Sequence, residues 1–323
     1  MYISVPDVFF VPVYYAEKDL VIGVSFPTQR EYKWVRDRAT MENYAKEKGV
    51  TLKIENADTD VAKQASQVEN LISQGIDILI LAPTDSVATA PLVEKAHKAG
   101  IKVIAYDRSI YAIDLDLYIA FNNIRIGELQ GRFLVRSVPK GNYIIMSGDP
   151  KDDNSRFMKE GAMEYIQPLV ATGDIKIVAD KAVDNWEPKN AFNIVKDALI
   201  ANKNKIDAIL APNDATAGAA IQALAAQGLA GKVVVTGMDG DLSAIQRIVQ
   251  GTQSMTVLKD SRELSRTAID SAIKLASGAG IDINGRVTNV SSILLTPIAI
   301  DKTNVDKVII DSGYYKKEEV YKR

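Results

Sequence analysis

Residues 76–108, IDILILAPTDSVATAPLVEKAHKAGIKVIAYDR, contain the pattern that decides the fold. Two apolar runs, at 76–81 and 101–106, have the length of buried strands. The stretch between them is helical from residue 87 to residue 99 and ends at Gly100. Strands that are apolar throughout and joined by helices are typical of a parallel sheet covered on both faces. The segment therefore predicts an α/β fold.

The same alternation continues on both sides of this segment. Before it, apolar runs at 20–25 and 51–54 alternate with helical stretches at 34–48 and 60–74. A second set starts near residue 124, with strands expected at 143–146, 175–178, 208–210, 233–236 and 255–258. A helix at 262–276 follows, and then extended segments at 292–295 and 308–310. Two consecutive sets predict two doubly wound parallel-sheet lobes. One closed (β/α)8 barrel is the alternative, because its eight strand–helix units would give the same alternation of apolar runs and helical stretches in the sequence.

Composition excludes several kinds of chemistry. The 323 residues include 39 Lys plus Arg, 41 Asp plus Glu, one histidine and no cysteine, and the length suggests about two domains. Without cysteine the chain has no disulfide, cysteine-zinc site, iron–sulfur cluster or catalytic thiol. The lone His97 excludes histidine-rich metal sites, and we expect a surface role for it, no metal and no cofactor. The net charge of −2 gives no overall reason to bind nucleic acid.

The first 20 residues differ from the rest. They contain VFFVPVYY at 8–15, which is apolar but short and interrupted by Pro12. A bilayer span needs roughly 20 apolar residues, so we expect no membrane-spanning segment in this sequence. Because a basic flank and a cleavage site are missing, the stretch is not a complete signal peptide. We interpret residues 1–20 as the remnant of a leader or membrane anchor, a tag, or an arm packed on the body.

Polar side chains follow several of the predicted strands. They include Asp107-Arg108 after 101–106, Asn213-Asp214 after 208–210, Asp239 and Asp241 after 233–236, and Lys259-Asp260 after 255–258. The first turn adds Arg30, Lys33, Trp34 and Arg36, and the turn at 183–186 adds Asp184, Asn185 and Trp186. Open α/β sheets bind ligands beyond the carboxyl ends of their strands. Carboxylates, amides and cations bind hydroxyl groups, and aromatic faces cover C–H surfaces, so the set predicts a sugar site.

Each member of this set has a simpler explanation as well. Asp214 could cap a helix, and Asp239 and Asp241 could shape a glycine-rich turn. Lys259-Asp260 could be a solvated strand end, and the two tryptophans could be core residues. The pair Asp107-Arg108 is the hardest to explain by structure alone, because charges at the end of so apolar a strand need partners.

Signatures of common enzyme classes are missing. The first turn reads SFPTQR at 25–30, without the glycines of a dinucleotide-binding loop. Neither a phosphate-binding P-loop nor a G-x-S-x-G elbow occurs. Paired carboxylates could hydrolyse a glycoside. Here they alternate with Arg, Lys and Asn, which favours ionised hydrogen-bond acceptors over acid catalysis.

From Leu20 onward the chain resembles the periplasmic-binding-protein type I family, most closely its D-xylose-binding members. The resemblance is carried by IAYDR at 104–108, GELQ at 127–130, VDNWEP at 183–188, NKIDA at 204–208, NDATAG at 213–218 and GTQSMTV at 251–257. It implies two lobes joined by three hinge segments, near 120–123, 258–260 and 291–296, with a sugar enclosed between them. The N-terminal lobe would contain residues 21–121 and 260–291, and the C-terminal lobe residues 122–259 and 292–323.

The resemblance also implies ligand contacts and partners. The expected contacts are Lys33, Trp34, Arg36, Asp107, Arg108, Asn154, Trp186, Asn213, Asp239 and Lys259. Members of the family act outside the cytoplasm and present their closed form to an ABC transporter permease or to the sensor domain of a histidine kinase. We therefore predict an extracytoplasmic binding protein for D-xylose or a close pentose, and no enzymatic activity. The alternatives are a pentose-processing enzyme and the effector domain of a sugar-responsive transcription regulator.

Overall fold

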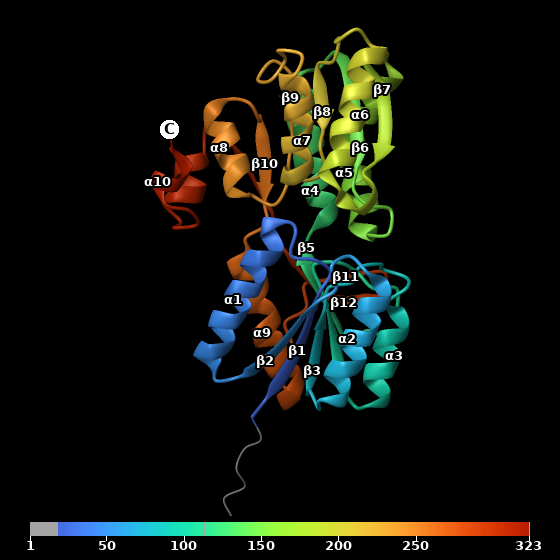
Figure 1. The fold of residues 1–323 in the computed structure, drawn as a ribbon, viewed down its shortest axis with the longest axis vertical. Helices are drawn as coiled ribbons and strands as arrows, with labels where there is room; N and C mark the ends of the chain where they lie inside the picture. The colour runs from blue at the N-terminus through green and yellow to red at the C-terminus, as the bar shows by residue number, and fades with distance from the viewer. Residues whose placement is uncertain (1–18, 113, 323) are drawn as a thin grey trace, which may run out of the picture.

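One large sheet in each lobe, with a two-stranded sheet beside the second, organises residues 19–112 and 114–322, which are the residues that the computed structural model describes (Figure 1). The first sheet has the strand order β11-β12-β5-β4-β3-β1-β2 and is parallel except for β11. Its strands are β1 (Val21–Phe26), β2 (Thr51–Asn56), β3 (Ile78–Leu81), β4 (Lys102–Tyr106), β5 (Leu117–Phe121), β11 (Gly285–Val287) and β12 (Val290–Leu295).

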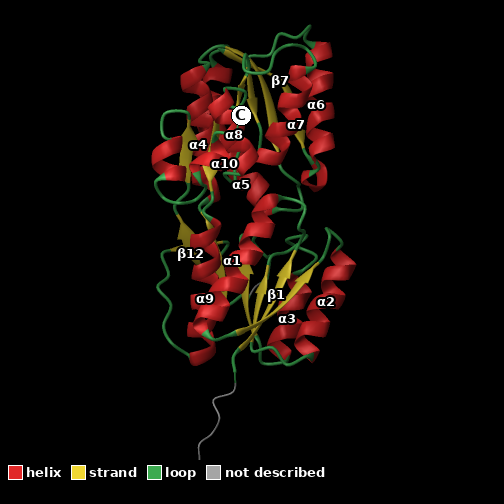
Figure 2. Ribbon diagram, turned by 60° about the vertical axis from the view of Figure 1, so that its left-hand side comes forward, coloured by secondary structure: helices red, strands yellow, loops and turns green. Residues whose placement is uncertain are grey.

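Helices cover both faces of this first sheet (Figures 1 and 2). One face packs against α1 (Tyr32–Lys48) and α9 (Ser261–Ser277), the other against α2 (Val61–Ser73) and α3 (Ala90–Lys98). Alternate residues of β3 belong to different cores: Ile78 and Ile80 lie under α1 and α9, Leu79 and Leu81 under α2 and α3. Burial on both faces explains why these strands are apolar throughout.

The second lobe contains a parallel sheet of order β7-β6-β8-β9 and an antiparallel pair, β10-β13. The strands are β6 (Gly141–Ser147), β7 (Ile175–Ala182), β8 (Ala208–Leu210), β9 (Val234–Val235), β10 (Met255–Leu258) and β13 (Ile298–Asp301). The helical elements are α4 (Asn123–Ser137), α5 (Asp153–Ala171), η1 (Asp184–Trp186), α6 (Pro188–Ala201), α7 (Asp214–Ala225), α8 (Leu242–Gln250), η2 (Asp306–Ile310) and α10 (Lys317–Val320).

The chain passes between the lobes three times. The crossings lie between β5 and α4, between β10 and α9, and between β12 and β13. The first two fall in the predicted segments 120–123 and 258–260, and the third lies at 296–297, at the end of the predicted segment 291–296. Separate open sheets with free edges are not a closed ring, so the barrel alternative is wrong and the two-lobed α/β fold is confirmed.

Several elements differ from the sequence-based expectation, among them the following three. Strand β5 was not predicted, because the connection from β4 to β5 is a loop and breaks the alternation of strands with helices. Residues 308–310 were predicted to be extended but belong to the helical turn η2, whose Ile309 packs with Val305 one turn earlier. Residues 292–295 were assigned to the second lobe, yet they pair with β5 in the first sheet.

The described part of the chain begins close to the first strand. The predicted leader, anchor or tag at 1–20 lies almost entirely outside the described residues, which begin at Asp19. Over 19–112 and 114–322, each helix is either too short or too polar to cross a bilayer.

Candidate ligand-binding site

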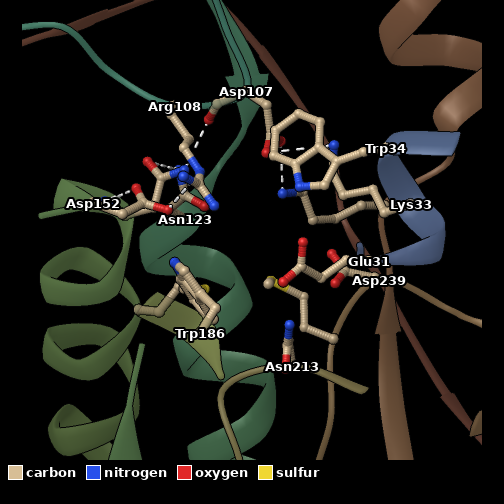
Figure 3. A pocket seen from close by; sticks show the side chains of 14 residues that line it. Glu31, Lys33, Trp34, Asp107, Arg108, Asn123, Asp152, Trp186, Asn213 and Asp239 are labelled. Carbon is tan, nitrogen blue, oxygen red and sulfur yellow. Dashed lines mark hydrogen bonds and ion pairs between the residues drawn. The ribbon is translucent and has the colours of Figure 1, made fainter. Parts of the chain in front are cut away.

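A pocket lies between the two lobes, where the carboxyl ends of the strands of the first sheet face loops and helix ends of the second lobe (Figure 3). The space free of protein atoms in and around it, open solvent included, is about 380 Å3. Its lining residues are Glu31, Lys33, Trp34, Asp107, Arg108, Asn123, Asp152, Asn154, Met158, Trp186, Asn213, Met238, Asp239 and Lys259.

Lysine and aspartate side chains form a buried charge cluster at one end of the pocket. Asp107 lies between two lysines, with Lys259 Nζ at 2.6 Å and Lys33 Nζ at 3.4 Å from its oxygens. Lys33 also contacts Asp37 at 2.5 Å, one helical turn along α1. Burial by itself would raise the pKa of Asp107, but the charges of Lys259 and Lys33 outweigh it and lower the pKa to about 2. Asp107 is therefore an ionised hydrogen-bond acceptor at neutral pH.

An ion pair and two hydrogen bonds of Asn154 join the lobes beside this cluster. Arg108 Nε lies 2.9 Å from Asp152 Oδ2 of the second lobe, so this pair crosses the cleft. Asn154 Nδ2 donates to the backbone carbonyl of Asp107 at 2.8 Å, and its Oδ1 accepts from Tyr118 and Asn123. Because these groups have one another as partners, they fix the positions of Arg108 and Asn154 without a ligand.

Aromatic rings enter the pocket from both lobes. Figure 3 shows Trp34 on α1 of the first lobe and Trp186 on the facing side, in the loop between β7 and α6. Lys33 Nζ lies 3.9 Å from the centre of the Trp34 ring. Both indoles are nearly buried, with exposed fractions of 3% and 5%. Their faces offer apolar surfaces on two sides of the same space.

Unpartnered polar atoms are concentrated in this pocket. Within the described residues, nine buried side-chain nitrogen or oxygen atoms have no hydrogen-bond partner in the protein, and five of them belong to pocket residues. These five atoms are Glu31 Oε2, Asp107 Oδ1, Asn123 Oδ1, Trp186 Nε1 and Asp239 Oδ1. Asp107 Oδ1 still has its ion pair with Lys259. Leaving such an atom buried and unpaired costs about 1–3 kcal/mol, so the arrangement suits a ligand rich in both donors and acceptors.

Asn213 and Asp239 complete the second lobe's contribution. Asn213 is the N-cap of α7, and its Oδ1 accepts from the backbone N–H of Thr216 at 2.9 Å. Its amide nitrogen is thereby left to face the pocket (Figure 3). Burial raises the pKa of Asp239, with the lysines Lys259 and Lys33 acting in the opposite direction. The cap of α7 is thus Asn213, and not Asp214 as the simpler reading allowed.

Comparison with known proteins decides the family. A model of the periplasmic binding protein domain matches residues 22–280, most of the chain. This chain belongs to the periplasmic-binding-protein family. A D-xylose-binding periplasmic protein from Haemophilus influenzae is 44% identical over 308 residues, with 94% of this chain and 93% of the relative covered. A protein of the same description from Escherichia coli is 43% identical over 307 residues, with the same coverage.

Solved structures agree with that assignment. A carbohydrate transporter solute-binding protein from Chloroflexus aurantiacus in complex with D-glucose has a TM-score of 0.89 at 31% identity, covering 94% of this chain and 98% of that one. A solute-binding protein from Clostridium phytofermentans with bound β-D-glucose has a TM-score of 0.87 at 32% identity, covering 93% and 99%. The relatives are described as binding proteins and not as enzymes.

Nine of the ten predicted contacts line the pocket of this periplasmic binding protein, and their roles toward a ligand are still predictions. The nine are Lys33, Trp34, Asp107, Arg108, Asn154, Trp186, Asn213, Asp239 and Lys259. Arg36 is not among the lining residues. Its guanidinium lies 3.8 Å from the ring centre of Tyr314 and 4.6 Å from that of Tyr315. Three residues along α1 from Lys33 amount to about 4.5 Å of rise, which carries Arg36 beyond the pocket toward these C-terminal tyrosines.

Five lining residues were not predicted: Glu31, Asn123, Asp152, Met158 and Met238. Asn123 starts α4 directly after the unpredicted strand β5, so its strand-end position was not visible. Met158 stands four residues after Asn154 on α5, and this helical spacing was an available signal. Glu31 lies at the N-cap of α1 but makes no cap hydrogen bond with its side chain. Among the described residues, no cluster of histidine, aspartate and glutamate side chains could hold a metal ion.

Proposed function

We propose that this chain is an extracytoplasmic binding protein that closes on D-xylose or a close pentose and releases it unchanged. The observation that carries the proposal is the set of unpartnered buried polar atoms between two indole rings in a pocket shared by both lobes. A sugar hydroxyl both donates and accepts, so a small polyol supplies partners for carboxylate, amide and indole groups together. The preference for D-xylose rests on the two relatives of that description at 43–44% identity.

Closure of the lobes strengthens the hydrogen bonds between the sugar and the protein. The carboxylates of Glu31 and Asp239 accept from hydroxyl groups, and Trp186 Nε1 donates to a sugar oxygen. Hydrogen bonds to charged groups contribute about 1.5–3 kcal/mol each once water is excluded. The indoles of Trp34 and Trp186 cover the C–H faces of the ring. A sugar that lacks one hydroxyl leaves a buried group unpaired, which is the basis of discrimination.

The closed form is also the signal to a membrane partner. Sugar shifts the population from separated to closed lobes, and a partner that prefers the closed surface responds to sugar concentration. The proposed partners are an ABC transporter permease or the sensor domain of a histidine kinase. Deleting the chain from its host distinguishes them: loss of pentose uptake points to the permease, and loss of pentose-induced transcription with uptake intact points to the kinase.

Ligand binding is tested by thermal shift and titration calorimetry with a panel of pentoses and hexoses, combined with product analysis. We expect D-xylose to raise the melting temperature, to bind with one site per chain, and to be recovered unchanged. The proposal is wrong if no pentose raises the melting temperature, or if the sugar is converted to a product.

A further inference from the structure

A separate group of contacts crosses the mouth of the cleft next to the pocket. Arg30 of the first lobe reaches the loop of the second lobe that carries Trp186. Its Nη1 lies 3.0 Å from Glu187 Oε2, and its Nη2 donates to the backbone carbonyl of Asn185 at 2.6 Å. The side chains of Arg30 and Glu187 are 34% and 42% exposed, so as a plain surface ion pair they would contribute little.

The same guanidinium also holds a pocket residue. Arg30 Nε and Nη2 donate to Glu31 Oε1 at 3.0 and 2.5 Å. The side chain of Glu31 is only 6% exposed, and its second oxygen, Oε2, is buried without a partner. Figure 3 shows Glu31 among the side chains that line the pocket. One carboxylate therefore offers one oxygen to the ligand space and the other to the arginine that spans the cleft.

The loop that receives Arg30 has an unusual backbone. Asn185 and Trp186 both have a φ of 54°, in the left-handed region that a bulky aromatic residue rarely adopts. This conformation directs Trp186 into the pocket, where its exposed fraction is 5%. Because Arg30 belongs to the other lobe, its bond to the Asn185 carbonyl supports the loop only while the lobes are together.

We propose that Glu31, Arg30 and Glu187 form a latch through which an occupied pocket slows the opening of the lobes. This inference rests on the proposed function and deepens it. In the closed but empty protein, Glu31 keeps a buried, unpaired carboxylate oxygen, which disfavours closure without ligand. A sugar hydroxyl that donates to Oε2 removes that penalty and fixes Glu31, which in turn holds Arg30 against Asn185 and Glu187. Such a difference between the empty and the occupied closed state is what a ligand needs to shift the equilibrium.

The latch acts after the sugar has entered. The contacts of Arg30 with Asn185 and Glu187 form only between lobes that have already met, so losing them should speed release much more than it slows association. The chain offers a direct readout, because its two tryptophans both line the pocket. Stopped-flow tryptophan fluorescence therefore follows binding and release of D-xylose without a label.

The experiment compares Arg30→Ala with the matched control Arg38→Ala. Arg38 pairs with Glu42 at 2.9 Å on an exposed part of α1, the helix that follows Arg30 in the chain, and lies outside the pocket. For Arg30→Ala we expect release of D-xylose to be at least five-fold faster and association to change less than two-fold. For Arg38→Ala we expect both rates to match those of the wild type.

Two further variants separate the contacts of the latch. Arg30→Lys keeps the charge but cannot bind Glu31, Asn185 and Glu187 together, so its release rate should lie between those of the wild type and Arg30→Ala. Glu187→Gln keeps the contact with the Asn185 carbonyl and should accelerate release about two-fold. The double variant Arg30→Ala/Glu187→Gln should release sugar no faster than Arg30→Ala alone. The reason is that Arg30→Ala already removes the ion pair with Glu187 that Glu187→Gln weakens.

The outcomes separate the latch from the proposed function. If the wild type binds D-xylose and Arg30→Ala releases it within two-fold of the wild-type rate, the latch is contradicted and the proposed function stands. If the wild type binds no pentose by fluorescence or calorimetry, the proposed function itself is contradicted. Should Arg30→Ala lower the melting temperature of the unliganded protein, Arg30→Lys decides the question: release that is no faster than in the wild type contradicts the latch.

Discussion

Asp239 is a buried carboxylate with one oxygen that faces the pocket unpaired. We expect Asp239→Asn to weaken sugar binding roughly 10- to 100-fold, the loss of a charge-assisted hydrogen bond of about 1.5–3 kcal/mol. Because burial raises the pKa of this group, the ionised form is disfavoured by its surroundings. The melting temperature of the unliganded variant should therefore equal or exceed that of the wild type, as measured by calorimetry.

Asp241 provides the matched control for that change. Burial also raises its pKa, and it lies two residues away, but it does not line the pocket. Asp241→Asn should leave sugar affinity within about three-fold of the wild-type value. Equal losses of affinity in the two variants would mean that the site is not where we place it.

His97 gives the protein a pH-dependent contribution to stability. Its Nδ1 lies 3.0 Å from Asp114 and its Nε2 lies 2.7 Å from Asp116. Burial lowers the pKa of His97, but hydrogen bonds and charge from the two aspartates outweigh it, so the folded pKa is raised above the ordinary value of about 6.5. The stabilisation is fully present below about pH 6.5 and is lost as the pH rises through the raised folded pKa.

Denaturant unfolding of the wild type and of His97→Gln at pH 6 and pH 9 measures this contribution. We expect the stability advantage of the wild type over the variant to be larger at pH 6, by no more than about 1 kcal/mol because the aspartates are partly exposed. An advantage that is the same at both pH values, or larger at pH 9, would contradict the assignment.

Much of the site could be predicted at the residue scale, for a definite reason. Asp107, Asn213 and Asp239 follow buried strands of a parallel sheet, and the topology brings such positions to one edge. Arg36 could not be predicted in this way: it follows Lys33 by three residues, yet the rise of the helix carries it beyond the pocket to Tyr314. The role of Glu31 depends on which of its oxygens meets Arg30, and that is a property of three-dimensional packing.

At the scale of elements, the contact between α4 and α5 positions three pocket residues. Asn123 starts α4, and Asn154 and Met158 lie on the first turns of α5. The helices approach so closely at Gly127 that an added Cβ would lie 1.9 Å from the carbonyl oxygen of Met158. Gly127→Ala should therefore separate the helices, destabilise the protein by about 1–3 kcal/mol in chemical denaturation, and weaken sugar binding.

Gly280 is the control for this substitution. An added Cβ there meets no atom within 4 Å, and its φ is not in the left-handed region. Gly280→Ala should change the free energy of unfolding by less than about 0.5 kcal/mol. If Gly127→Ala is equally silent, the close helix contact does not hold the pocket residues in place.

Helix ends were predictable because they depend on local chemistry. The glycine stop expected at residue 100 has a φ of 77°, and the glycines that directly follow the helical stretches predicted at 34–48 and 60–74, Gly49 and Gly75, both have a φ of 70°, a region that glycine enters without steric cost. Strand β5 and the turn η2 were not predictable in the same way. A short apolar run such as LYIAF or VII fits either a strand or a helix until its neighbours are known.

At the scale of the whole molecule, the structure shows the lobes in contact across the cleft. Besides Arg108 with Asp152, the backbone N–H of Ser86 donates to the carbonyl of Lys151 at 3.0 Å. These bonds and the burial of the pocket describe a closed form. The two-lobed arrangement was visible in the sequence as two sets of strands and helices, whereas the contacts across the cleft depend on side chains that meet only after folding.

The central claim, that the lobes close on a small sugar, is tested most directly by the distance between them. The chain has no cysteine, so Val87→Cys and Ile200→Cys, at exposed positions of the first and second lobes, accept one spin label each. Pulsed electron resonance then gives the distance distribution without and with saturating D-xylose. In the free protein we expect a broad distribution of label-to-label distances that does not match the closed form. After D-xylose is added we expect a single narrow peak at the closed-form distance. An identical distribution under both conditions would contradict the account.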